Sequence, residues 1–162
     1  MGDFVTWMRA TGVSEWVRSD PMTWPIMEML HFIGMSLLLG VIGTLDFRLL
    51  GFMKGIPMAA LRKLMPWGIA GFVINMVTGV LFFVGAPDQY LKNPAFYVKI
   101  LFLLIAGLNA LIFETRWGSR VLELGPLDRT PTAFKVAGVV SIFSWFMVLY
   151  WGRMLPFIGN AF

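Results

Sequence analysis

Residues 25–45 read PIMEMLHFIGMSLLLGVIGTL, and the only ionisable side chains among them are Glu28 and His31. A helix needs roughly 20 apolar residues to cross a bilayer, so this stretch is long enough to span one. An ionisable group at membrane depth costs on the order of 2.5–3.5 kcal/mol on insertion scales, and it usually faces partners inside a helical bundle. His31 is the only histidine of the chain, so any imidazole chemistry depends on it.

Three further apolar stretches follow, at residues 64–86, 95–113 and 136–152, and Lys99 is their only charged residue. Apolar residues make up 58% of the chain and charged residues 14%, whereas soluble domains average about 25% charged residues. Lipid must therefore cover the apolar surface. The sequence predicts an all-α integral membrane protein with four transmembrane helices in an up-down bundle. The predicted single membrane domain covers residues 1–162, with spans at about 24–50, 64–86, 95–115 and 133–155.

The first 20 residues are too polar to span, and they predict an interfacial amphipathic helix. Two sets of apolar residues recur at i, i+3 and i+4, which places each set on one helical face: Phe4, Trp7 and Met8, then Val13, Trp16 and Val17. Such a segment serves either as an attachment to the membrane surface or as a docking face for a partner. Further along, the prolines of residues 87–94 predict a turn between the second and third spans.

The basic residues are unevenly distributed between the two ends of the predicted spans. Eight lie in or beside the loops after the first and third spans, and five lie on the opposite side. The positive-inside rule therefore puts those two loops in the cytoplasm and both termini outside a bacterial inner membrane. Since the net charge of +4 comes from short loops at span ends, the sequence argues against a nucleic-acid partner.

Span directions predict a polar layer in the outer third of the membrane, at about 1.5 Å per residue. Glu28 and His31 share a helix face there, because residues three apart are neighbours on a helix. We expect Lys99 or Arg153 to neutralise Glu28. The other expected members of the layer are Asn75, Thr78 and Tyr150. A purely structural cluster and a site for a ligand, cofactor or proton both remain open.

A second polar layer is expected near the inner ends of the spans. Asp46 and Arg48 close the first span, where their simplest interpretation is a cap with locally compensated charge. Asn109 and Glu114 lie toward the inner end of the third span, and Arg62 and Arg116 are candidates to pair with the acids. Pairs of small residues at helix-packing spacing predict a tight bundle: Ser36 and Gly40, Gly68 and Gly71, Ala106 and Ala110, Ala137 and Ser141.

The available side chains limit the chemistry. His31 could hold haem b as an axial ligand, and Met76 or Met147 lies at a suitable depth for the second ligand. A carboxylate-bridged di-iron site needs two Glu-x-x-His units, and this chain has one. Copper binding by methionine thioethers and a proton- or copper-linked transporter using Glu28 and Asp46 remain alternatives. No arrangement typical of an enzyme is present.

The first span and its end hold Trp24-Pro25-x-x-Glu28-x-x-His31-x-x-Gly34 and Asp46-x-Arg48-Leu49-Leu50-Gly51. Later motifs are Pro66-Trp67, Gly71-Phe72, Thr78-Gly79, Asn93-Pro94-Ala95-Phe96-x-x-Lys99, Ala106-Gly107-Leu108-Asn109-Ala110 and Gly152-Arg153. With these motifs the chain resembles, over nearly its whole length, a widespread family of small bacterial inner-membrane proteins of unknown function. The resemblance implies the four-span fold. The family in turn looks distantly similar to copper-resistance protein D and to cytochrome b-like membrane bundles.

These observations together favour a non-catalytic subunit of a larger membrane complex, with a redox complex as one option. The expected partners are the lipid bilayer and either other membrane subunits or further copies of the chain. The layer around Glu28 and His31 would hold a cofactor or lipid. The alternatives are a haem-binding electron-transfer protein and the transporter.

Overall fold

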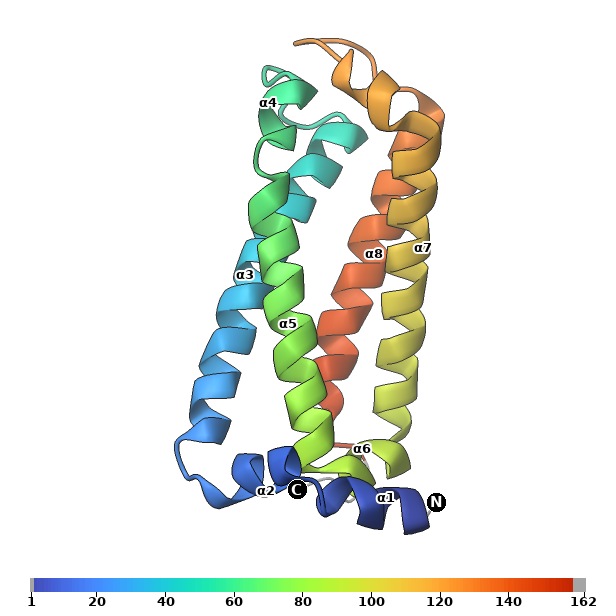
Figure 1. Cartoon of the computed structure of the whole chain (residues 1–162). Helices are drawn as coiled ribbons and strands as arrows, with labels where there is room; N and C mark the ends of the chain where they lie inside the picture. The colour runs from blue at the N-terminus through green and yellow to red at the C-terminus, as the bar shows by residue number, and fades with distance from the viewer. Residues whose placement is uncertain (1, 159–162) are drawn as a thin grey trace.

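The structure is a computed structural model that describes residues 2–158 of the chain (Figure 1). Across these residues the only regular secondary structure is α-helix. The helices are α1 (Gly2–Arg9), α2 (Gly12–Ser19), α3 (Thr23–Leu50), α4 (Met58–Arg62), α5 (Met65–Gly85), α6 (Pro87–Lys92), α7 (Pro94–Leu122) and α8 (Thr132–Met154).

Four helical stretches are long and apolar enough to cross a membrane: α3, α4 with α5, α7 and α8. Figure 1 shows that they lie side by side and alternate in direction along the chain. Helices α1, α2 and α6 lie at one end of them, and α8 also finishes there. We call this the α1–α2 end and the opposite one the α4 end. Both ends of the described chain therefore lie at the α1–α2 end.

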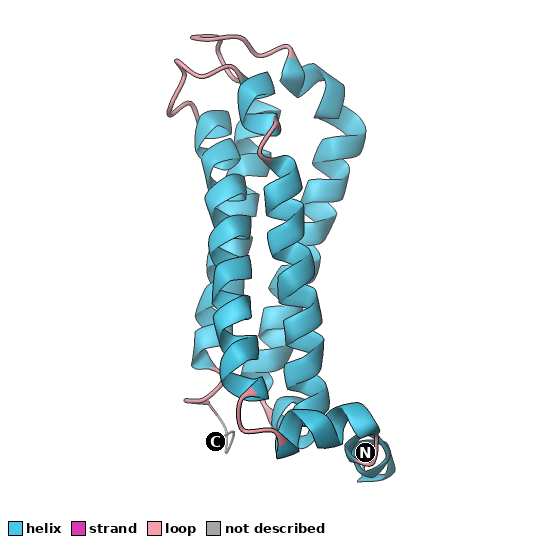
Figure 2. Cartoon of the chain, turned by 60° about the vertical axis from the view of Figure 1, so that its left-hand side comes forward, coloured by secondary structure: helices cyan, strands magenta, loops and turns pink. Residues whose placement is uncertain are grey.

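The long helices pack mainly as two pairs, α3 with α5 and α7 with α8, and contacts between α3 and α8 join the pairs. Figure 2 shows the long helices from a second direction, with loops and short helices at their ends. The closest approach within the first pair is at Gly34 and Gly71. A Cβ atom added to Gly71 would lie 2.5 Å from the carbonyl oxygen of Gly34. The two backbones are therefore in contact, and neither position has space for a side chain.

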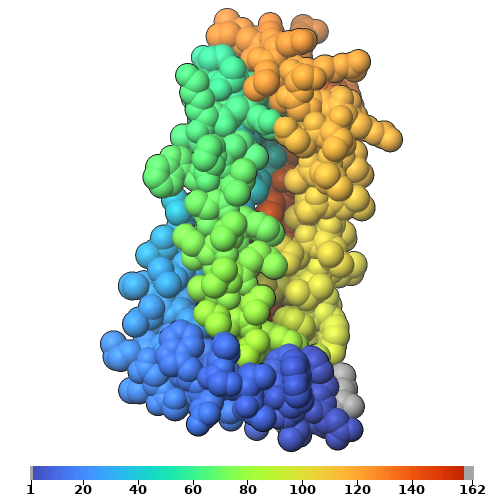
Figure 3. Space-filling view, in the orientation of Figure 1, coloured from blue at the N-terminus to red at the C-terminus, as the bar shows by residue number. Residues whose placement is uncertain are grey.

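Helix α7 lies at the edge of this arrangement. Only 6% of its most apolar window is buried, against 22–28% in the other three candidate spans. It follows α5 in the order of the long helices, but the two do not pack closely in the part of the chain that the structure describes. Figure 3 shows a hollow between them in which atoms of α8 are visible. The helices therefore do not close into a complete ring.

A hydrophobic core lies at the α4 end. Leu49, Met58, Leu61, Val121 and Phe134 form this cluster, which draws on α3, α4, α7 and α8. It is extended by an aromatic group in which Phe134 packs on the rings of two α7 residues at 5.5–5.8 Å between centroids. This core positions the loops that follow α3 and α7.

Several helix boundaries differ from the predicted ones. Helix α7 continues past the predicted end of the third span near residue 115 and stops at Leu122, shortly before the helix-breaking Gly125 and Pro126. Residues 87–92 form α6 instead of a turn, since Pro87 begins a helix without losing a hydrogen bond. The amphipathic segment is two helices rather than one, and the side chain of Thr11 caps the second by accepting from Ser14 N–H.

The prediction for the small residues is correct only in part. Gly68, Gly71, Ala106, Ala137 and Ser141 are buried where helices meet. Ser36, Gly40 and Ala110 are exposed instead and contribute nothing to internal packing. Spacing along one helix cannot distinguish these cases, because it does not tell which face meets a neighbour.

Candidate functional site

His31 and Thr78 form a direct link between α3 and α5. Nδ1 of His31 lies 2.7 Å from Oγ1 of Thr78, and the Thr78 hydroxyl donates to the carbonyl of Ile74 at 2.8 Å. With the Thr78 proton directed to Ile74, we assign His31 as the donor through Nδ1–H to the Thr78 oxygen. Nε2 has no hydrogen-bond partner in the described residues. The ring edge packs against Phe82 at 5.6 Å between centroids.

Glu28 lies one turn before His31, but it is exposed and forms no ion pair within residues 2–158. Its Oε1 accepts a hydrogen bond from Nε1 of Trp24 at 3.2 Å. The prediction that Lys99 or Arg153 neutralises Glu28 is therefore wrong. Arg153 is exposed, and its guanidinium lies over the ring of Phe157 at 5.3 Å.

Lys99 of α7 is half-buried at the same end of the molecule. Its Nζ lies 3.5 Å from the position that a Cβ on Gly152 of α8 would occupy. The described residues offer the ammonium neither a hydrogen bond nor a carboxylate. The structure thus joins His31 to Thr78, and Lys99 lies at the same end of the molecule on α7; we call these three residues the His31 layer.

Tyr90 was missed as a member of this region, because its position near a span end is typical of an interfacial aromatic residue. It lies in α6 and packs on Phe96 at 5.4 Å and on Phe83 at 6.1 Å between ring centroids. Burial raises the pKa of Tyr90 to about 12, and the nearby carboxylate of Glu28 contributes to that shift. Tyr90 therefore stays a neutral phenol at ordinary pH.

The remaining residues predicted for this layer are separated from His31. Met76 is 42% exposed and lies two positions from the buried Thr78, on the opposite side of α5. Tyr150 is exposed and packs on Trp151. Met147 is half-buried on α8. Asn75 does face the α3–α5 contact, where its Oδ1 is buried and has no hydrogen-bond partner among the described residues.

Arg48 is the largest fully buried side chain, with 0% of its surface exposed. Its Nε donates to the carbonyl of Ile56 at 2.8 Å, and its Nη2 donates to the carbonyl of Gly125 at 2.8 Å. Arg48 therefore connects the loop after α3 to the loop after α7. The predicted interfacial cap is wrong, because the guanidinium is enclosed by two loops and has no carboxylate partner in the described chain.

Asp46 is also buried, at 5% exposure, and faces Ser141 of α8. It cannot reach Arg48, because residues two apart point to opposite sides of a helix. One oxygen of Asp46 and the hydroxyl of Ser144 are buried without a partner in the described residues. Asp46, Ser141 and Ser144 thus form a second polar group, the Asp46 layer, between α3 and α8.

The two α7 residues predicted for the inner ends have separate roles. Nδ2 of Asn109 donates to the carbonyl of Ala137 at 3.1 Å and so connects α7 to α8. Both oxygens of Glu114 accept from Arg62 at 2.7 Å, a bidentate pair that the sequence analysis included among its candidates. This pair joins α4 to α7 at the surface of the α4 end.

As a possible metal centre, the layers lack ligands: within residues 2–158, no three His, Asp or Glu side chains lie close enough to hold an ion together. Comparison of the chain with protein-family models, with curated proteins and with solved structures finds no match.

Proposed function

We propose that this chain is a non-catalytic, multi-pass subunit of the bacterial inner membrane that associates with further copies of itself through α3. The observation that carries the proposal is an outward stripe of small residues on α3, formed by Ser36, Gly40 and Thr44. Ser36 and Gly40 are exposed, Thr44 is half-buried, and a Cβ added to Gly40 would meet no atom within 4 Å.

The stripe contrasts with the glycines inside the molecule. Gly34, Gly68, Gly71 and Gly138 all lie against a neighbouring helix, so their lack of a side chain is already explained. In a bilayer, small residues let two helix backbones approach closely, and the association gains van der Waals contacts. An outward face with no such contact is therefore suited to a helix from another molecule.

The hydroxyls of the stripe do not need water. Ser36 donates to the carbonyl of Phe32 at 2.9 Å, and Thr44 donates to the carbonyl of Gly40 at 2.6 Å. Because both protons are used within α3, this face can lie against lipid or another helix at no cost of an unmade hydrogen bond.

Membrane insertion in the predicted orientation is part of the proposal. Four apolar stretches of sufficient length support it, as does the position of both chain ends at the α1–α2 end. The excess of basic residues at the α4 end favours that end as the cytoplasmic one.

The test uses the absence of cysteine from the natural sequence. In native membranes, Ser36→Cys should form a disulfide-linked dimer on mild oxidation, because two copies of the stripe face each other. Gly107→Cys on α7 is the matched control, since Gly107 is also exposed with open space around it. Adding Gly40→Leu to Ser36→Cys should abolish the dimer. Equal cross-linking at positions 36 and 107, or none at position 36, would contradict the proposal.

A second candidate function is the binding of haem b, and the hydrogen bond from His31 to Thr78 favours it. A partner on Nδ1 orients an axial histidine and leaves Nε2 for the metal. Met76 lies on the exposed side of α5 and does not supply the second ligand, which leaves Met147 of α8 as the other candidate. The visible spectrum of the purified chain decides this candidate: a Soret band lost in His31→Ala supports it, and no Soret band before or after reduction rejects it.

A further inference from the structure

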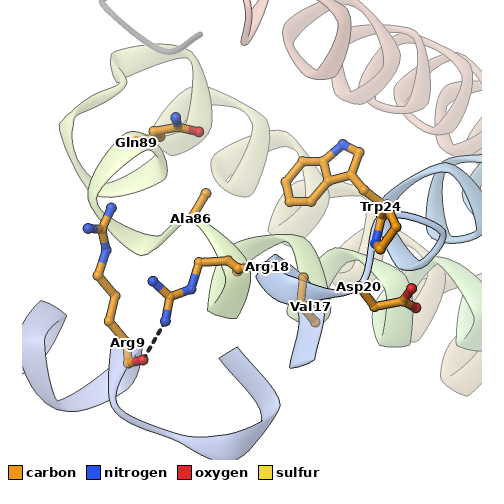
Figure 4. A pocket seen from close by; sticks show the side chains of 9 residues that line it. Arg9, Val17, Arg18, Asp20, Trp24, Ala86 and Gln89 are labelled. Atoms are coloured by element: carbon orange, nitrogen blue, oxygen red, sulfur yellow. Dashed lines mark hydrogen bonds between the residues drawn. The ribbon is translucent and has the colours of Figure 1, made fainter. Parts of the chain in front are cut away.

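An open pocket of about 450 Å³ lies at the α1–α2 end. Pockets that bind small molecules usually measure about 300–1,000 Å³, so this one is large enough for a headgroup or metabolite. Figure 4 shows Arg9 and Arg18 next to each other, with Gln89 and Trp24 on other walls. The complete lining is Arg9, Val17, Arg18, Asp20, Pro21, Trp24, Gly85, Ala86 and Gln89.

The guanidinium of Arg18 is held in place by backbone groups of α1 and α2. Its Nε donates to the carbonyl of Ser14 at 3.1 Å, and its Nη2 donates to the carbonyl of Arg9 at 2.7 Å. An arginine has five N–H donors, and these two bonds use two of them, so three remain for a ligand. Orientation by neutral carbonyls leaves the positive charge of Arg18 uncompensated.

The other two charged residues at the pocket already have partners on the chain. Arg9 forms an ion pair with Asp88 of α6. The carboxylate of Asp20 accepts from the backbone N–H of Met22 and the hydroxyl of Thr23, and Figure 4 shows it pointing away from Arg18. In the described part of the chain Arg18 has no carboxylate within ion-pair distance. The pocket therefore presents Arg18 as the cation that is free to meet an anion, while the carboxylate of Asp20 points away from it.

The position and the walls of the pocket favour an anion with an apolar part. Trp24 lies in the first turn of α3 and Gly85 is the last residue of α5, so the pocket is level with the ends of two candidate spans. Tryptophan is enriched at the headgroup level of membranes because its ring is apolar and its N–H is polar. Val17, Pro21 and Trp24 supply apolar surface beside the guanidinium.

We propose that this pocket binds the phosphate of an anionic phospholipid headgroup, with Arg18 as its main contact. An arginine fork matches the geometry of phosphate oxygens, and the amide of Gln89 adds a neutral donor. The glycerol and upper acyl carbons lie against Trp24 and Pro21. The proposal rests on the membrane insertion proposed above and is independent of association through α3.

The test is native mass spectrometry of the full chain in a neutral detergent, titrated with phosphatidylglycerol, with phosphatidylcholine and with inorganic phosphate. The unchanged chain should retain one phosphatidylglycerol, and Arg18→Gln should weaken this binding about tenfold, which corresponds to about 1.4 kcal/mol. Arg18→Lys keeps the charge but loses the fork, so its binding should be weaker than that of the unchanged chain and stronger than that of Arg18→Gln. Lys92→Gln, which removes an exposed cation of α6 outside the pocket, should change nothing.

Equal binding by Arg18→Gln and the unchanged chain would overturn the proposal, as would a loss in Lys92→Gln as large as in Arg18→Gln. Equal losses in Arg18→Lys and Arg18→Gln would show that charge does not hold the ligand, which also overturns it. If inorganic phosphate binds and competes fully with lipid, free phosphate is the ligand and the lipid assignment fails. The same spectra give the oligomeric state of the chain. Loss of self-association can therefore be distinguished from loss of lipid binding.

Discussion

The two ends of the long helices use their buried polar side chains differently. At the α4 end, Arg48 satisfies two backbone carbonyls from different loops and lies next to the hydrophobic core. At the α1–α2 end, His31 connects only α3 and α5, and Lys99 has no polar partner in the described chain. Nη1 of Arg48 is buried without a partner in the described residues, but its other two nitrogens join two loops and so stabilise the fold. Within residues 2–158, His31 and Lys99 each keep a nitrogen without a partner, so they are available to bind a ligand or a group from another molecule.

This comparison predicts the largest loss of stability for Arg48→Ala. The substitution leaves the carbonyls of Ile56 and Gly125 buried without a donor, and each costs about 1–3 kcal/mol. Together with the lost packing, we expect a destabilisation of about 3–5 kcal/mol, measured by thermal unfolding in detergent. Arg48→Lys cannot reach both carbonyls with one nitrogen and should recover only part of it. A loss no greater than for an exposed arginine, such as Arg129→Ala, would contradict the assigned role.

The next largest effect is expected at the α3–α5 contact. Gly71→Ala places a Cβ 2.5 Å from the carbonyl oxygen of Gly34. Such overpacking costs about 1–3 kcal/mol. The control is Gly79→Ala on the same helix, where the new methyl group meets open space. Gly79→Ala should be neutral or slightly stabilising. Similar thermal midpoints for the two variants would argue that α3 and α5 are further apart than described.

A smaller effect is expected for the hydrogen bond of the His31 layer. Thr78→Val removes the acceptor for His31 Nδ1–H while keeping the shape, and should cost about 1 kcal/mol. Thr78→Ser keeps the hydroxyl and should retain most of the stability. Nitrogen NMR of the imidazole checks the mechanism directly: the unchanged chain should show a protonated Nδ1, and Thr78→Val should lose this preference. An unchanged tautomer in Thr78→Val would contradict the assignment.

The smallest expected effect concerns Asp20 at the start of α3. Hydrogen bonds from the Thr23 hydroxyl and the Met22 N–H lower the pKa of Asp20 below its usual value near 3.8. A lowered carboxyl pKa contributes stability that is present above the unfolded value and is lost as the pH falls through the folded value. The thermal midpoint of the unchanged chain should therefore fall more steeply below about pH 4 than that of Asp20→Asn. Parallel curves for the two chains would exclude the contribution.

Hydropathy alone predicted where the four apolar helices lie, because a span requires a long run of apolar residues whatever it packs against. The same information predicted that His31 and Thr78 occur at a similar depth. It did not predict their direct contact, which depends on how α3 and α5 are rotated about their axes. The rotation also explains why Met76 was a candidate by depth, although it lies on the exposed side of α5.

The role of Arg48 could not be predicted from its own segment. A charged residue at the end of an apolar run usually remains at the interface, and only the loops around Ile56 and Gly125 enclose this one. For the same reason, the stripe of Ser36 and Gly40 was grouped with Gly68 and Gly71. Those two pairs have similar spacing but differ in whether a neighbouring helix covers them.

The bond between Arg48 and the Gly125 carbonyl also has a consequence for biogenesis. The acceptor lies 77 positions after the donor, so a growing chain has already released α3, α4 and α5 from the ribosome before Arg48 can obtain it. Until then, Nη2 of Arg48 must donate to a water molecule or a lipid headgroup instead. The α4 end is thus completed only once the third long helix has emerged. In a nascent chain halted before that point, Arg48 would have the carbonyl of Ile56 but not that of Gly125.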